Sequence, residues 1–106
     1  MKNEFITVEK LARIIHDYRH DEHLDKKDNK DDLIKAITVE AGELLECILF
    51  RGEVYDWEYR LQQDSIQKEL ADILIYCFSL AHHMKWDVEK IIRDKIRYNK
   101  ERGREY

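Results

Sequence analysis

Apolar residues recur every three or four positions along most of the chain, which is the spacing of an α-helix. The first such run follows Thr7, a residue type that often caps a helix, and includes Val8 and Leu11. Strand-like alternation and proline are both absent, so the pattern favours helices throughout. The predicted helices run from Thr7 to about Tyr18, from about Asp31 to Arg51, from about Asp64 to Met84 and from Asp87 to Gly103.

The connections between these runs are short. The segment His20–Asp32 is dense in mixed charges and is typical of a solvated loop, with a flexible flap over a site as the alternative. The segment Gly52–Gln63 joins the second and third helices and has room for one helical turn, and glycine favours helix ends at Gly52 and Gly103. Residues 1–106 therefore predict one all-α domain with a four-helix bundle-like fold.

Carboxylates interrupt the apolar faces of the second and third predicted helices. Glu40 and Glu43 are one turn apart on the face that carries Leu44, and Glu69 and Asp72 repeat the spacing on the third helix. A buried carboxylate without a partner is costly or takes up a proton. Carboxylates on two helices that face one another therefore need a cation between them.

Two kinds of cation fit this pattern. Lysine or arginine would form a structural salt-bridge network, which explains one acidic pair better than two matched pairs. A hard divalent ion explains both pairs, because oxygen ligands without histidine or thiolate suit Mg²⁺ or Mn²⁺. A di-iron bundle would need Glu-x-x-His motifs, and His82 and His83 stand too far along the third helix. Since Mg²⁺ often shares its ligands with substrate phosphates, the pattern favours a phosphate-handling site.

Composition and charge restrict the partners and the location. The net charge of −4 argues against a passive nucleic-acid binder, whose affinity rests on Lys and Arg. No apolar run approaches the roughly 20 residues of a membrane-spanning helix, and no targeting signal is apparent, so we expect a cytoplasmic protein without a membrane or nucleic-acid partner. Cys47 and Cys77 lie in apolar helical patterns and are expected to be buried thiols.

The two acidic pairs, with 25 residues between them, resemble the signature of the MazG-like all-α nucleoside triphosphate pyrophosphohydrolases. The surrounding VEAGELLE and KELADILIY match that signature, and Lys95-x-x-x-Asn99-x-x-Arg102 is similar to the basic tail of the family. The resemblance covers roughly Asp31–Gly103. Some MazG-type members carry a further glutamate where this chain has Val39, which places the resemblance closer to the small dCTP pyrophosphatase-like branch.

The resemblance implies Mg²⁺-dependent hydrolysis of a nucleoside triphosphate between the α- and β-phosphates, with Mn²⁺ as a possible substitute. The products would be a nucleoside monophosphate and pyrophosphate, and the role would be to clear modified or surplus nucleotides. The implied metal ligands are Glu40, Glu43, Glu69 and Asp72. Glu43 or Glu69 would also orient or deprotonate the attacking water.

Candidate phosphate contacts lie on the third and fourth helices. Lys95, Asn99 and Arg102 share a helical face and are expected to bind phosphate oxygens. The alternative is that these residues only compensate the dipole at a helix end. Tyr76, on the same face as Glu69, is either a hydrogen-bond donor to the substrate or a packed core residue.

The nucleobase needs an aromatic platform with a few polar groups. Trp57, Tyr55 and Trp86 are the candidates, and Trp57 lies in the connector where a pocket wall can form; ordinary core packing is the alternative for each.

Apolar residues away from the carboxylate faces predict a homo-oligomer, either a dimer or a tetramer built as a dimer of dimers. These residues are Leu45, Leu49, Leu74 and Ala81. An alternative function from another class is a non-catalytic helical interaction module in which the acids form salt bridges between helices or subunits.

Overall fold

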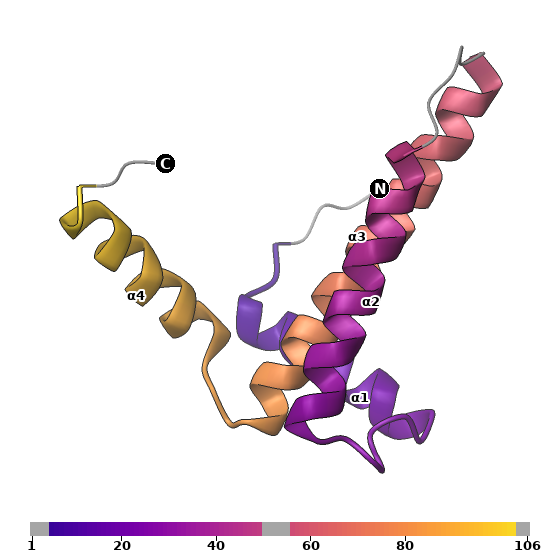
Figure 1. Ribbon diagram of the computed structural model, residues 1–106. Helices are drawn as coiled ribbons and strands as arrows, with labels where there is room; N and C mark the ends of the chain where they lie inside the picture. The colour runs from indigo at the N-terminus through magenta and orange to yellow at the C-terminus, as the bar shows by residue number, and fades with distance from the viewer. Residues whose placement is uncertain (1–4, 50–55, 104–106) are drawn as a thin grey trace.

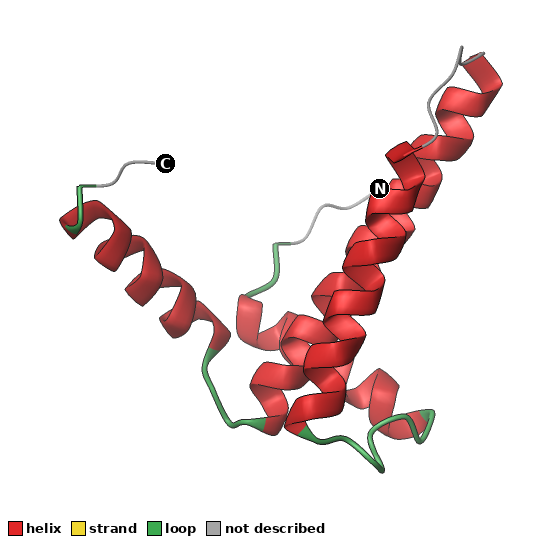
Figure 2. Ribbon diagram, viewed as in Figure 1, coloured by secondary structure: helices red, strands yellow, loops and turns green. Residues whose placement is uncertain are grey.

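The computed structural model describes residues 5–49 and 56–103, and for residues 56–60 only the backbone. In the described part of the chain there are four α-helices and no strand, which confirms the all-α prediction (Figures 1 and 2). The helices are α1 (Val8–Asp21), α2 (Lys30–Leu49), α3 (Asp56–His83) and α4 (Val88–Glu101).

The helices α2 and α3 form a long antiparallel hairpin, which is the most extensive contact in the fold (Figure 1). The helix α1 packs against α3 near the end where α3 terminates, and it also touches α4. The helix α4 leaves that same end and diverges from the hairpin, so among the described residues it makes at most marginal contact with α2 or α3.

Side-chain caps fix where three of the helices begin. The Lys10 amide donates to Thr7 Oγ1 at 3.0 Å, and the Lys90 amide donates to Asp87 Oδ1 at 3.1 Å, so both predicted N-caps are confirmed. At α2, the Asp32 amide donates to Asn29 Oδ1 at 2.9 Å. Each bond satisfies an amide that has no partner inside its helix.

The largest difference from the sequence-based prediction is the start of α3. This helix begins at Asp56, two turns before the predicted Asp64, so much of the expected connector is helical. A hydrogen bond from Gln62 Nε2 to the Cys47 carbonyl, at 2.8 Å, ties this early part of α3 to α2. The predicted end of the second helix, at Arg51 and Gly52, lies outside the described residues.

Two helices end in a left-handed residue that is not glycine. His23 after α1 has φ 60° and Lys85 after α3 has φ 62°. In both places the next amide reaches back five residues, from Leu24 to the Arg19 carbonyl and from Trp86 to the Ala81 carbonyl, each at 2.8 Å. This is the Schellman geometry, which turns the chain sharply away from the helix axis. Only three residues, Met84, Lys85 and Trp86, then separate the end of α3 from the cap of α4.

The loop between α1 and α2 is fastened by Arg19. This guanidinium, on a residue only 7% exposed, donates to both carboxylate oxygens of Asp28 at 2.7 and 3.1 Å and to the Leu24 carbonyl at 3.2 Å. It also lies 5.7 Å from the ring centroid of Tyr76 on α3. The loop is therefore held against α1 and α3, which favours the solvated loop over a free flap.

The chain leaves an unusual amount of apolar surface in solvent. Its accessible surface is 9204 Å², against about 6,300 Å² for a folded monomer of this mass. Its radius of gyration is 16.9 Å, against about 13 Å for a compact chain of this length. Leu45, Leu49 and Leu74 are half exposed, as predicted, but Ala81 is buried because the chain turns back over it at the end of α3. No helix of the described residues is both long and apolar enough to cross a bilayer.

We predict that Arg19→Ala lowers the free energy of unfolding by about 3 kcal/mol, because the substitution leaves Asp28 partly buried without its partner. Arg19→Lys should recover only part of this loss, since an ammonium lacks the two-pronged geometry. Urea denaturation measures both. Arg93→Ala, which breaks an exposed pair with Glu89, should cost at most about 0.5 kcal/mol. An equal effect at both arginines would contradict the role assigned to Arg19.

Candidate functional site

Three of the four predicted metal ligands meet where α2 faces α3. One oxygen from each of Glu40, Glu43 and Glu69 lies within 4.8 Å of the others. The helical spacing places Glu40 and Glu43 one turn apart on α2, and the packing of the hairpin brings Glu69 of α3 against them. The helical periodicity of the sequence therefore correctly placed these three carboxylates close together.

The environment of this cluster disfavours a negative charge at Glu40. Partial burial, together with the hydrogen bond and charge of Glu43, raises the pKa of Glu40 to about 7. The charges of Asp72 and Glu69 contribute less. Without a cation, this carboxyl group is thus partly protonated near neutral pH.

The oxygens of the cluster are short of partners. Glu69 Oε2 is buried and has no hydrogen-bond partner among the described residues. No Lys or Arg in the described part of the chain forms a salt bridge with Glu40, Glu43 or Glu69. A divalent cation with oxygen ligands would satisfy both the orphaned oxygen and the excess negative charge, so the residues present fit Mg²⁺ or Mn²⁺.

Asp72, the fourth predicted ligand, lies outside the tight group. It is exposed on α3, one turn beyond Glu69, and its charge acts on Glu40. The structure therefore places Asp72 beside the cluster but not within the 4.8 Å set.

An open groove of about 380 Å³ adjoins the carboxylates. Its walls come from α2 and α3 and combine acidic, amide, hydroxyl and apolar groups. The lining residues are Glu43, Glu46, Cys47, Leu61, Gln62, Ser65 and Glu69. Glu43 and Glu69 face this groove, whereas Glu40 is not part of its lining.

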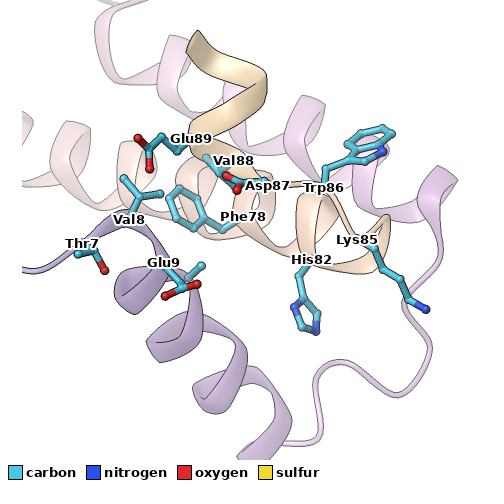
Figure 3. Close-up of a pocket in the computed structure, with 11 residues that line it drawn as sticks. Thr7, Val8, Glu9, Phe78, His82, Lys85, Trp86, Asp87, Val88 and Glu89 are labelled. Carbon is cyan, nitrogen blue, oxygen red and sulfur yellow. The ribbon is translucent and has the colours of Figure 1, made fainter. Parts of the chain in front are cut away.

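A larger cavity of about 540 Å³ lies elsewhere, where the start of α1, the end of α3 and the start of α4 meet (Figure 3). Phe78 points toward Val8 across it, and Trp86 projects away from α1 (Figure 3). Trp86, one of the candidate base platforms, thus belongs to this junction and not to the carboxylate groove.

His82, near the end of α3, packs against α1. The His82 and His16 rings are 4.0 Å apart at their centroids. Partial burial lowers the pKa of His82, and the charge of His16 acts in the same direction. His82 does not adjoin the carboxylates, consistent with the absence of Glu-x-x-His motifs.

The predicted substrate contacts are not gathered around the carboxylates within one chain. Lys95, Asn99 and Arg102 stand on or next to the far half of α4, which diverges from the hairpin (Figure 1). The ring of Tyr76 packs beside the Arg19 guanidinium. The side chain of Trp57 and the whole of Tyr55 lie outside what the structure describes.

Sequence reasoning overlooked Tyr98. Its ring centroid is 4.7 Å from Lys95 Nζ and 5.2 Å from Arg102 Cζ, so it lies between the two predicted phosphate-binding cations. The signal was present in the spacing, because Tyr98 follows Lys95 by three positions and precedes Arg102 by four. Tyr98 thus groups two positive charges on one part of α4.

Known protein families and solved structures show which proteins this chain resembles. Residues 35–105 match the MazG-like family. The chain belongs to the MazG-like family. A solved structure described as a pyrophosphatase from Archaeoglobus fulgidus has a TM-score of 0.76 and 22% identity, over 96% of this chain and 96% of that one. No curated protein matches the sequence. The MazG-like fold is thus established, and the dCTP pyrophosphatase-like branch stays a prediction.

We predict that the metal-free MazG-like chain loses stability as the pH rises from about 4.5 to about 7. The pKa of Glu40 rises from 4.5 to about 7 on folding, so the folded state binds more protons than the unfolded state within this window. The contribution of the protonated group is complete below 4.5 and is lost as the pH passes 7. Thermal melts at constant ionic strength measure the trend.

Glu40→Gln should flatten this pH dependence, whereas Asp31→Asn, at an exposed site on the same helix, should leave it unchanged. Addition of Mg²⁺ should stabilise the unsubstituted protein more at pH 8 than at pH 6, since protons compete with the cation. An equal metal-dependent shift at both pH values would contradict the assignment of Glu40 as a ligand.

Proposed function

We propose that this MazG-like protein is a nucleoside triphosphate pyrophosphohydrolase that depends on Mg²⁺, with Mn²⁺ as a possible substitute. The observation that carries the proposal is the cluster of Glu40, Glu43 and Glu69 beside an open groove. Family membership supports hydrolysis of a phosphoanhydride bond. The substrate bond is the one between the α- and β-phosphates, so the products are a nucleoside monophosphate and pyrophosphate.

The carboxylates divide the work by position. Glu40 and Glu69 are partly buried between the helices and would hold the cation, while Glu43 is exposed at the groove and Asp72 extends the acidic surface. When bound, Mg²⁺ neutralises triphosphate charge and acidifies water at the site. Glu43 or Glu69, which both face the groove, accepts the proton from the attacking water.

The groove also supports a small substrate. Beside the acids it offers the Gln62 amide and the Ser65 hydroxyl as polar groups, with Leu61 as an apolar wall. These groups allow contact with sugar or base while the phosphates approach the cation. The biological role that fits is clearance of modified or surplus nucleotides in the cytoplasm.

The alternative, a non-catalytic module held by salt bridges, has less support. Within one chain, no described Lys or Arg forms a salt bridge with Glu40, Glu43 or Glu69, so the partners of these acids would have to come from a second subunit. Stabilisation by Mg²⁺ that disappears in Glu40→Gln would favour the enzyme over the module.

We predict that the first products of a nucleoside triphosphate are pyrophosphate and the monophosphate, without orthophosphate. The reason is that attack at the α-phosphorus releases the β- and γ-phosphates together. Separate assays for pyrophosphate and orthophosphate, over a panel of normal and modified nucleotides, measure this and rank the bases. A diphosphate with orthophosphate as first products would place the phosphates in another register.

We predict that Glu69→Gln lowers kcat by at least about 100-fold, because the amide removes both a negative ligand and a proton acceptor. The helical circular dichroism should persist, since the substitution also relieves repulsion in the cluster. Asp64→Asn, at an exposed position of the same helix, serves as the matched control and should retain activity. Near-normal turnover in Glu69→Gln would remove this residue from the active site.

A further inference from the structure

The contact between α1 and α3 holds a group of histidines that the proposed reaction does not use. His16 and His20 are four residues apart on α1, so they lie on one face of that helix. Their ring centroids are 5.9 Å apart, and the ring of His82 on α3 lies 4.0 Å from that of His16. Imidazole is the commonest side-chain ligand for metals in proteins. Two packed helices therefore bring three such ligands to one place.

A carboxylate from the loop after α1 stands beside these rings. Asp25 accepts a hydrogen bond from His20, with 3.1 Å between His20 Nδ1 and Asp25 Oδ2. This bond lowers the pKa of Asp25, and the charges of His20 and His16 act in the same direction. The Asp25 side chain is therefore ionised at neutral pH. It adds a negative oxygen ligand to the nitrogen ligands of the two helices.

A small cavity of about 20 Å³ lies among these groups. His16 of α1, His82 of α3 and Asp25 of the loop all line it. Its volume exceeds the roughly 10–15 Å³ that one water molecule needs, so the cavity has room for a single small ion. Two imidazole nitrogens and one carboxylate oxygen form a ligand set that Zn²⁺ accepts, at bond lengths of about 2.0–2.2 Å.

The charges around this cavity favour a cation. Arg19 also lines it, but its guanidinium donates to both oxygens of Asp28, so these two charges compensate each other. The Asp25 side chain has no ion-pair partner other than His20 among the described residues. Burial lowers the pKa of His82, and the opposing charges of Asp25 and Asp28 only reduce this effect. The His82 ring is therefore neutral at pH 7 and keeps a lone pair for a metal ion.

We propose that His16, His82 and Asp25 form a binding site for Zn²⁺ or a similar transition-metal ion, separate from the carboxylate cluster between α2 and α3. Water completes the four ligands, and His20 holds Asp25 in place through its hydrogen bond. In the described part of the chain only the carboxylate cluster already has three ligand atoms within 4.8 Å of one another, so the ion must draw the histidine-site ligands inward. The His82 side chain is exposed, which leaves its ring free to turn and gives the ion access from solvent.

The two sites select different ions. Mg²⁺ prefers oxygen ligands, as the carboxylate cluster supplies, whereas imidazole nitrogen suits Zn²⁺. An ion at the histidine site ties α1 to α3 and to the loop that carries Asp25. Its binding therefore stabilises the contact between the two helices and takes no part in the reaction. The proposal does not depend on the proposed function, and it would hold for a chain without hydrolase activity.

A Zn²⁺ titration by calorimetry, without nucleotide, tests the proposal. The carboxylate cluster and the thiol of Cys47 beside it can also bind Zn²⁺, so all proteins in the test carry Glu40→Gln and Cys47→Ser. This background protein should still bind one Zn²⁺ ion per chain. Circular dichroism without metal confirms that each variant is helical before it is titrated.

Substitutions at the histidines locate the bound ion. Loss of a partner outside the ligand set typically weakens metal binding about 10–100-fold, so we expect about 10-fold for His20→Gln and at least about 100-fold for His16→Gln or His82→Gln. His83→Gln, at the next position of α3, is the matched control and should bind Zn²⁺ as the background does. No binding by the background protein, or equal binding by all the variants, overturns the proposal.

Hydrogen exchange gives a second readout, which reports the tie between the helices. Zn²⁺ should slow amide exchange in residues 16–28 of the background protein, because the ion holds this segment against α3. The effect should disappear in His82→Gln, whose substitution lies on the other helix, and persist in His83→Gln. Slower exchange confined to α2, or a Zn²⁺ effect that survives His82→Gln, would place the ion elsewhere and refute the site.

Discussion

Carboxylates held against one another across two packed helices repel unless a cation or a proton separates them, and the rest of this molecule is arranged around that constraint. The contact between α2 and α3 is the most extensive in the fold, and it contains Glu40, Glu43 and Glu69. The surface along which α2 and α3 pack is therefore also the surface that carries the candidate metal ligands. A cation that binds here neutralises the repulsion, so its binding also stabilises the hairpin. Because the pKa of Glu40 is raised to about 7, a proton on this carboxyl group relieves the same repulsion when no cation is bound.

The second constraint is that four helices of this length leave many apolar side chains uncovered. Only Leu33 and Ala81 are buried apolar residues among those described, while residues such as Leu70 and Ile92 remain near half exposure. A chain with so small a core of its own gains most from association, since burial of apolar surface is the main favourable term in folding. The surfaces that remain exposed carry charged residues as well as apolar ones.

Features that depend on neighbouring residues were predictable from the sequence, whereas features that depend on contacts between distant residues were not. Thr7 and Asp87 were identified as caps because a cap depends on a few neighbouring residues, and the acidic cluster followed from helical periodicity alone. The start of α3 was misplaced because the hydrogen bond from Gln62 to Cys47 joins residues far apart in sequence. Lys85 gave no sign of its left-handed conformation, since glycine is the usual marker of such a turn. The direction of α4, and hence the separation of Lys95 from the acids, depends on that turn.

The hydrogen bonds from Arg19 to the loop after α1 affect how readily proteases cleave the chain there. Lys26 and Lys27 are exposed and look like natural trypsin sites. Proteases, however, favour segments that can leave the surface, and these lysines stand between Leu24 and Asp28, which Arg19 holds from both sides. Cleavage at this point would therefore report the opening of the Arg19–Asp28 ion pair, and its rate would follow the fraction of molecules in which that pair is open more closely than the exposure of the lysines.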